Sequence, residues 1–434
     1  MPMPRPSLAD IADPAVWQDG VPHDTFTWLR ANEPVAWWDH PGGQKGFWVV
    51  SRWQDVVDLS RNTEVFSSRA GVVNLDDLAP DQLEARRTML EEDPPRHTEL
   101  RALVDPDFSP RAIKAWEDTF RALTQMVLNE TLRQQSFDFV EQVAKALPIR
   151  ILGKILGVPE QHTDDLVTWG NQMLGASDPD YHDPELAAYS PESLRKLPFG
   201  HPAALRAFAL AEKMAGERRA GQPDDVTARL RFGQVQGASL SDEEYKATWL
   251  MLVIAGNETT RHALSHGLLV FIEHPEQWDR RRRRPDRLGI AAEEILRWAT
   301  PINWHRRQVT AAYELHGVEL QPGDKLILAF TSANRDETVF DDPFRFEMTR
   351  KPNPHVSFGR GGPHHCLGAF LARMEVRIVF EELLKRVTGF RLAGPVQRLQ
   401  SNHLNGIKAL PIEVALNEKG FGNSACHSEW SGAE

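Results

Sequence analysis

One cysteine stands inside a glycine-rich segment and is the first candidate for chemistry. Residues 358–368 read Phe-Gly-Arg-Gly-Gly-Pro-His-His-Cys-Leu-Gly, and an amphipathic helical pattern follows over residues 369–387. A helix N-terminus carries unpaired N–H groups and the positive end of the helix dipole, so it favours the thiolate form of Cys366. The glycines let the backbone turn N–H groups toward the sulfur and leave room for a flat group beside it.

The chemistry of Cys366 depends on what it binds. A single sulfur anion suits the axial position of a haem iron. Zinc would need three or four ligands at close spacing, which the segment does not supply. The alternative is that Cys366 is a small apolar residue at the start of an ordinary helix, so other polar residues must decide between the two.

Small and polar residues interrupt the most apolar helical pattern of the chain, residues 242–273. Polar groups in a buried helix are costly and need a reason. Oxygen activation supplies one, because Ala255 and Gly256 leave space and Gly256 permits a local widening of the helix. Thr259 can then hold a water or dioxygen, while Glu258 relays protons. The alternative is a helix kink solvated by water.

With these features the chain resembles the soluble bacterial cytochromes P450, which are haem-thiolate monooxygenases, from about residue 10 to about residue 415. The resemblance implies the P450 fold, mainly α with a small β lobe (α+β), whose long central helix crosses the haem. It also implies one catalytic domain over residues 1–416. Phe358 and Cys366 are eight positions apart, one more than is usual, as in family members that oxidise sterols and branched isoprenoid lipids.

The resemblance assigns roles residue by residue. It implies heme b (iron protoporphyrin IX), with Cys366 as the iron ligand and Glu258 and Thr259 as the catalytic acid–alcohol pair. His97 and Arg101 are four apart, so they share a helix face and can clamp a haem propionate. The expected haem contacts are His97, Arg101, Ala255, Gly256, Arg307, Phe358, Gly359, His364 and Gly368. The expected substrate pocket is Val72, Val73, Met251, Ile302, Trp304 and Leu404, and the expected structural triad is Glu294, Arg297 and Arg345.

Other elements have to position these residues. We expect a hairpin over residues 34–53, a short helix over 54–67, a loop over the site at 69–92, helices over 110–170 with a strand at 137–140, and strands at 313–315 and 326–330. The family places a lid over the substrate at residues 171–208, here called the lid segment, and it is longer than usual. A last turn, residues 401–407, is expected to enter the pocket. Residues 417–434 are expected to form a frayed tail, in which Cys426 is incidental.

Composition excludes several classes of function. A net charge of -11 argues against nucleic acid as a partner, and the basic run at residues 280–284 is expected to be a solvated helix end. Two cysteines imply no disulfide framework and fit a reducing cytoplasm. The sequence has neither a signal-like start nor an apolar run long enough to cross a membrane.

The sequence therefore predicts a cytoplasmic monooxygenase that hydroxylates an apolar small molecule with O2, with a steroid side chain or a terpenoid favoured. It resembles no flavin or iron–sulfur protein, so we expect electrons from a ferredoxin and its NAD(P)H-dependent reductase. Two alternatives stay open. One is a haem-thiolate peroxygenase, dehydratase or isomerase, and the other is a non-catalytic haem or ligand binder.

Overall fold

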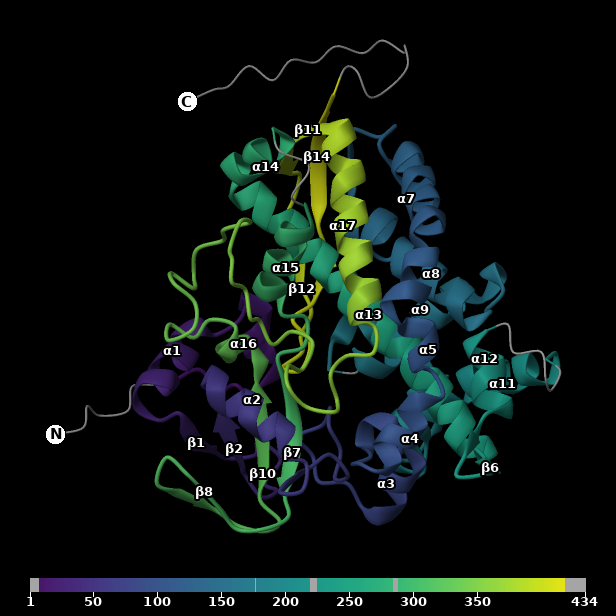
Figure 1. The fold of residues 1–434 in the computed structure, drawn as a ribbon, viewed down its shortest axis with the longest axis vertical. Helices are drawn as coiled ribbons and strands as arrows, with labels where there is room; N and C mark the ends of the chain where they lie inside the picture. The colour runs from purple at the N-terminus through teal and green to yellow at the C-terminus, as the bar shows by residue number, and fades with distance from the viewer. Residues whose placement is uncertain (1–7, 176, 219–224, 284–287, 418–434) are drawn as a thin grey trace.

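A computed structural model describes residues 8–175, 177–218, 225–283 and 288–417, and Figure 1 shows their arrangement. The N-terminal start, the tail from residue 418 with Cys426, and the last arginine of the basic run lie outside these residues. Helices fill the upper and right-hand parts of Figure 1, and the larger sheet lies at the lower left. This is the mainly α fold with a small β lobe (α+β) that the sequence predicts.

The central helix α13 (Asp242–Glu273) organises the helical part. It begins with a capping box, because Ser241 Oγ accepts the Glu244 N–H at 3.1 Å and the Glu244 carboxylate accepts the Ser241 N–H at 3.0 Å. Most of its residues are buried on every side, so it crosses the core. Its bounds match the predicted helix. The helix is α-helical throughout, so the prediction of a local widening at Gly256 is wrong.

The other helices pack around α13 or flank the sheet. They are α1 (His23–Asn32), α2 (Trp53–Arg61), α3 (Pro80–Ala85), α4 (Arg96–Ala102), α5 (Asp105–Phe108), α6 (Pro110–Ala115), α7 (Glu117–Thr131), α8 (Ala146–Leu156), α9 (Thr163–Leu174), α10 (Pro191–Arg195), α11 (Ala203–Gly216), α12 (Val226–Phe232), α14 (Pro275–Arg282), α15 (Leu288–Ala299), α16 (Phe330–Ala333) and α17 (Ala369–Arg386). Helices α8, α15 and α17 contact α13 directly.

The larger sheet has the strand order β1-β2-β10-β7-β3. Its strands are β1 (Val35–Trp38), β2 (Phe47–Val50), β3 (Phe66–Ser67), β7 (Trp304–Val309) and β10 (Lys325–Ala329). Strand β10 pairs in parallel with β2 and antiparallel with β7. The smaller pairings join β4 (Ser136–Asp138), β11 (Val387–Leu392) and β14 (Pro411–Leu416), β5 (Gln234–Val235) and β6 (Ala238–Ser239), β8 (Tyr313–Leu315) and β9 (Val318–Leu320), and β12 (Gln397–Arg398) and β13 (Ile407–Ala409).

Two expected segments differ from the structure. The predicted loop over residues 69–92 contains α3 and a 3-10 turn, Met89–Glu91. The predicted helix over 54–67 ends earlier, because α2 stops at Arg61 and β3 begins at Phe66. The lid segment is built from short pieces: the 3-10 turns Pro179–Tyr181, Pro184–Ala188 and Pro198–Gly200, and α10.

Candidate active site

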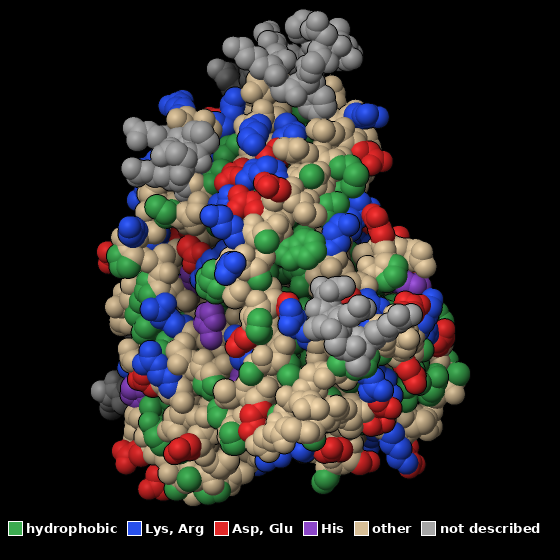
Figure 2. All heavy atoms as spheres, turned by 45° about the vertical axis from the view of Figure 1, so that its right-hand side comes forward, with side chains coloured by type: hydrophobic (Ala, Val, Ile, Leu, Met, Phe, Trp, Pro, Cys, Tyr) green, Lys and Arg blue, Asp and Glu red, His purple; other side chains and the backbone are tan. Residues whose placement is uncertain are grey.

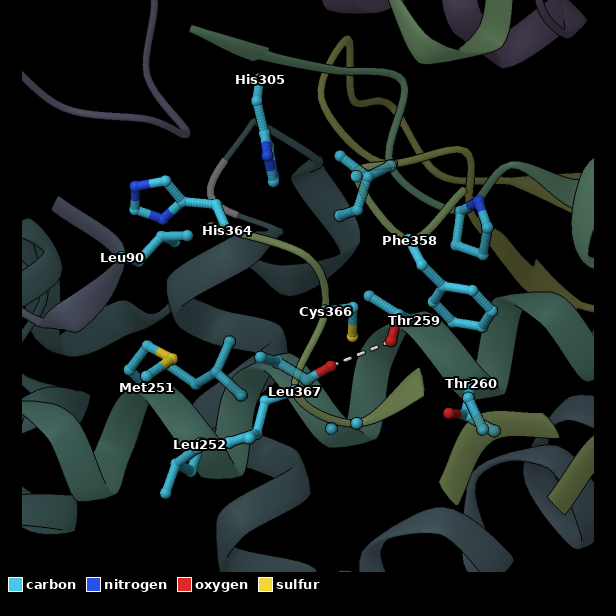
Figure 3. A pocket seen from close by; sticks show the side chains of 18 of the residues that line it. Leu90, Met251, Leu252, Thr259, Thr260, His305, Phe358, His364, Cys366 and Leu367 are labelled. Carbon is cyan, nitrogen blue, oxygen red and sulfur yellow. Dashed lines mark hydrogen bonds between the residues drawn. The ribbon is translucent and has the colours of Figure 1, made fainter. Parts of the chain in front are cut away.

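A cavity of about 260 Å³ lies between α13 and the segment that carries Cys366. The central helix forms one wall, and residues 357–368 with the start of α17 form the other. Side chains from α4, β7 and the turn around Leu404 close its edges. Figure 3 shows Cys366, Thr259 and His305 among the lining side chains. Most of the lining is apolar, so the cavity favours an apolar occupant.

The backbone of the cysteine segment folds tightly before α17 begins. The Cys366 N–H donates to Phe358 O at 2.8 Å, which closes the segment into a loop. Gly359 has φ +68°, which favours glycine. A Cβ on Gly362 would lie 2.0 Å from Ser60 O, so this glycine lets the loop pack against α2. Cys366 lies three residues before α17, whose N-cap is Gly368, so the sulfur is close to the helix N-terminus but outside the helix.

The Cys366 sulfur is open to the cavity although the residue lies deep in the protein. Burial raises the pKa of the Cys366 thiol, and the Gly368 N–H, Arg101 and Arg373 act in the opposite direction. The structure without a bound group therefore disfavours the thiolate, and a positive group placed in the cavity against the sulfur would oppose that shift. The loop therefore presents one sulfur and directs donors and cations toward it.

The helix wall facing the cysteine is small and carries one hydroxyl. Ala255, Gly256 and Thr259 line the cavity. Thr259 Oγ1 donates to Ala255 O at 2.9 Å, the hydrogen bond drawn in Figure 3. A Cβ on Gly256 would lie 2.9 Å from Leu152 Cδ2, so this glycine permits close packing of α13 on α8.

Glu258 does not line the cavity, although it is next to Thr259 in the chain. It is 2% exposed and pairs with Arg261 and the Asn257 side chain. Arg261 in turn donates to Asn171 Oδ1 at 2.8 Å, at the end of α9. Burial raises the pKa of Glu258, and Arg261 opposes that shift. Burial therefore makes Glu258 a weaker acid than an exposed glutamate, and its pairing with Arg261 limits that effect.

Imidazole and guanidinium groups collect at one edge of the cavity. The rings of His97 and His364 lie 4.0 Å apart between centroids, and both line the cavity. His97 Nε2 lies 3.0 Å from Pro363 O, and Arg101 Nη1 donates to His365 O at 2.5 Å. These contacts join α4 to the cysteine loop.

Arg307 lies near this edge but does not line the cavity. It is buried, its Nη1 donates to Arg306 O at 2.7 Å, and its Nε has no hydrogen-bond partner. Burial lowers the pKa of Arg307 to about 10. Alternate residues of a strand face the same side, so Arg307 shares a face of β7 with His305, which lines the cavity. A buried cation with a free donor is suited to an anionic partner.

Four of the six predicted pocket residues line the cavity: Val73, Met251, Ile302 and Leu404. Two do not. Val72 is fully buried outside it, where its carbonyl accepts the Arg306 N–H at 2.8 Å. Trp304 faces away and donates to Asn402 O at 2.7 Å. Strand alternation explains the second error, because His305 takes the cavity face.

Sequence reasoning missed Glu375, and in the last turn it singled out Leu404 but not His403; Glu375 and His403 both line the cavity. Glu375 lies on α17 and is 1% exposed, and neither of its carboxyl oxygens has a hydrogen-bond partner within normal distance. Burial raises the pKa of Glu375 well above its ordinary value, and the nearby Thr260 hydroxyl opposes this weakly. A charged residue within an apolar helical pattern was the available signal.

The predicted triad has a different third member. Glu294 and Arg297 form a fully buried pair with bonds of 2.7 and 2.8 Å. Arg345 is exposed, and its carboxylate contact is Glu347 at 3.9 Å, so its assignment to the triad is wrong. Arg350 donates to Glu294 Oε1 at 3.2 Å instead. The other guanidinium N–H groups of Arg350 donate to the backbone carbonyl oxygens of Asp341, Asp342 and Arg345.

These features fit an iron protoporphyrin. The sulfur opens into the cavity, small residues leave space opposite it, and Arg307 Nε and His364 Nδ1 are buried without hydrogen-bond partners at one edge. Among the described residues no group of three or more His, Cys, Asp or Glu side chains gathers as a metal site would. None of the helices in the described ranges is both long and apolar enough to span a membrane.

Comparison with known proteins gives the same answer. The chain is 37% identical over 424 residues to a steroid C26-monooxygenase of Mycolicibacterium smegmatis, covering 95% of each chain. It is 36% identical over 426 residues to a methyl-branched lipid omega-hydroxylase of Mycobacterium tuberculosis, covering 95% of this chain and 96% of that one.

Solved structures agree with these relatives. A Mycobacterium marinum cytochrome P450 in complex with pseudoionone superposes with a TM-score of 0.82 at 35% identity, covering 90% of this chain and 94% of that one. A Bacillus megaterium protein in complex with testosterone gives a TM-score of 0.78 at 29% identity, covering 90% and 97%. The sequence profile of the Cytochrome P450 family matches residues 14–283 and 290–409. These matches agree with a cavity that has the Cys366 loop on one wall and Thr259 on the other. The chain therefore belongs to the cytochrome P450 family and is a haem-thiolate monooxygenase.

Proposed function

We propose that this monooxygenase hydroxylates the apolar end of a steroid side chain or of a methyl-branched, terpenoid-like lipid. The observation that carries the proposal is the apolar cavity with Cys366 on one wall and Thr259 on the other. Substrate class comes from the relatives, which are named for steroid C26 and for the omega position of a branched lipid. Both names describe oxidation near the end of a branched apolar chain.

Bound heme b supplies the redox chemistry that inserts one atom of O2 into a C–H bond and releases the other as water. The chain contributes binding and protons. Cys366 is the iron ligand, and Phe358, Gly359 and Gly368 shape the loop around its sulfur. Ala255 and Gly256 leave space on the opposite wall. His97, Arg101, Arg307 and His364 are the groups proposed to hold the propionates, two of them with unused buried donors.

Proton delivery is assigned to Glu258 and Thr259. Thr259 presents its hydroxyl to the cavity while bonded to Ala255 O. Glu258 lies behind Thr259 and does not contact the cavity. Burial raises the pKa of Glu258, and Arg261 pairs with its carboxylate. In the proposed relay, a proton held by Glu258 would reach the cavity through water and the Thr259 hydroxyl.

Electrons are proposed to come from a ferredoxin and its NAD(P)H-dependent reductase, with the cytoplasm as the compartment. Arg360 lies on the exposed part of the cysteine loop and is the first candidate for docking. The arginines of α17 are less available, because Arg373 and Arg377 pair with Glu293, Glu117 and Glu381. On the face that Figure 2 draws, basic and acidic side chains are intermixed over the upper part.

A spectral titration tests the substrate. The haem-loaded protein is titrated with a cholestenone, a methyl-branched fatty acid, a linear fatty acid and an aromatic compound, and each product is identified with ferredoxin, reductase and NADPH. We expect a low-to-high-spin shift and terminal hydroxylation for one of the first two compounds. A shift and product only with aromatic compounds would contradict the substrate class.

The same assay separates the alternatives. Product formed with hydrogen peroxide but not with ferredoxin would indicate a peroxygenase. NADPH oxidation without product from any compound of the panel would indicate a binding protein. The retained Glu258 and Thr259 favour dependence on ferredoxin, because both alternatives dispense with delivered protons.

A further inference from the structure

Lys408 connects the lid segment to the last turn of the chain. Its Nζ lies 2.9 Å from the Asp178 carboxylate and also pairs with Asp180. Asp178 accepts two backbone hydrogen bonds besides, from Gln400 N and from Asp180 N, each at 2.9 Å. One carboxylate therefore holds the first 3-10 turn of the lid segment, the backbone at Gln400 just after β12, and Lys408 in β13.

The connection is buried at its centre. The side chain of Asp178 is 0% exposed and that of Lys408 is 11% exposed, whereas that of Asp180 is 65% exposed. Burial opposes both charges, but the Gln400 N–H and Lys408 outweigh it and hold the pKa of Asp178 below its ordinary value. In the same way Asp180 and Asp178 raise the pKa of Lys408. Removing one partner would leave the other charge buried and unpaired.

Both ends of this connection carry walls of the cavity. The lid segment contributes Leu174 and Phe199, and the last turn contributes His403 and Leu404. Backbone bonds fix the last turn to the strand β7 region, from Asn303 N to His403 O at 2.8 Å and from Asn405 N to Pro301 O at 2.9 Å. The last turn is therefore a rigid anchor to which the lid segment is attached.

In the described part of the lid segment, the other ion pairs remain within it, and the Asn171 side chain at its start accepts a hydrogen bond from Arg261 of α13. Asp183 and Glu185 pair with Arg206, and Glu192 pairs with Lys196. These pairs stabilise the short turns of the segment but do not attach it to the rest of the molecule. Lys408 is thus placed to decide how firmly the lid segment lies over the cavity.

We propose that Lys408 is a positioning residue: it holds the lid segment closed through Asp178 and so sets the rates at which a long apolar substrate enters and leaves. The attachment itself follows from the contacts above. Only the identity of the substrate rests on the proposed function, so the test uses readouts that need no substrate.

Hydrogen–deuterium exchange tests the attachment directly. The variant Lys408→Met keeps the length of the side chain and loses its charge, and Asp178→Asn keeps a capping oxygen for the lid turn while it removes the carboxylate. We expect exchange in residues 177–200 to rise about tenfold in both variants, as loss of one partly buried pair implies. Lys408→Arg should restore protection. Lys196→Met removes a lysine from a pair inside the lid segment and should leave exchange near that of the unmodified protein.

Binding of 4-phenylimidazole to the haem-loaded protein tests access. This compound is a bulky haem ligand, so stopped-flow spectra report its entry whatever the natural substrate is. We expect association and dissociation to become about tenfold faster in Lys408→Met, with a smaller effect on the equilibrium constant. Unchanged exchange and unchanged rates in both Lys408→Met and Asp178→Asn would overturn the proposal. If no compound of the spectral titration gave a spin shift or a product, the proposed substrate class would be overturned. The role of Lys408 in holding the lid segment would not be affected.

Discussion

Thr259 is the residue whose hydroxyl faces the cavity from the central helix. Its hydrogen bond to Ala255 O fixes the rotamer and leaves the oxygen lone pairs free to accept a hydrogen bond from water. Thr259→Ala removes that oxygen and keeps the helix, so the proposed proton path loses the hydroxyl through which protons reach the cavity. We expect product per NADPH to fall roughly tenfold or more and hydrogen peroxide to rise in its place. Thr259→Ser is the matched control, and unchanged coupling in Thr259→Ala would remove this residue from the proton path.

Glu375 makes a prediction about pH. Burial raises its pKa in the folded protein, so the folded state holds a proton that the unfolded state releases above pH ~4.5. Stability therefore falls as pH rises from that value toward the folded pKa, by up to about 1.4 kcal/mol per pH unit. Glu375→Gln has the same shape and no proton to lose. We expect the variant to match the unmodified protein at pH 4.5 and to be the more stable of the two at pH 8.

Urea unfolding at the two pH values measures this difference. Glu381→Gln is the control on the same helix, because Glu381 pairs with Arg121 and Arg377. It should be equally or less stable than the unmodified protein at pH 8. A Glu375→Gln variant that loses stability at pH 8 would show that Glu375 is ionised and has a partner.

At the scale of elements, the buried carboxylate of α15 depends on Arg350 and not on Arg345. Arg350 reaches Glu294 from the loop before the cysteine segment, whereas Arg345 points to solvent. Arg350→Met leaves Glu294 short of one charged donor, which costs about 2 kcal/mol. We expect that variant to bind less haem after purification, because the loop leads directly to the cysteine segment. Arg345→Met is the matched control and should retain haem, and the reverse ranking would restore Arg345.

The sequence predicts an element well where its residue pattern is compatible with only one local structure. The helix over residues 242–273 has a long apolar pattern and a capping box, and the structure confirms its bounds. The cysteine loop is visible in its glycines. Which of Trp304 and His305 faces the cavity depends on the register of β7, which is set by pairing with β10. Arg350 was missed because it lies in the same loop as Arg345, and the sequence does not show which of the two arginines reaches Glu294.

At the scale of the whole molecule, the cavity lies between two separately packed cores. Leu252 and Ile254 on its helix wall belong to the largest hydrophobic cluster, and Phe330 on its edge belongs to the cluster that packs on the larger sheet. Haem bound to Cys366 would contact both parts and be absent from the unfolded chain. A ligand present at about 100 times its Kd adds about 2.7 kcal/mol to the folded state. Haem binding should therefore stabilise the two parts together.

Thermal unfolding of haem-loaded and haem-free protein measures this coupling. We expect a higher Tm and one cooperative transition with haem, and a lower Tm without it. Cys366→Ala with added haem is the control, because it keeps the cavity and lacks the sulfur, so most of the stabilisation should be lost. An equal Tm in haem-loaded and haem-free protein would mean that the two cores are already joined by their own contacts. The cavity would then contribute to chemistry and not to the stability of the fold.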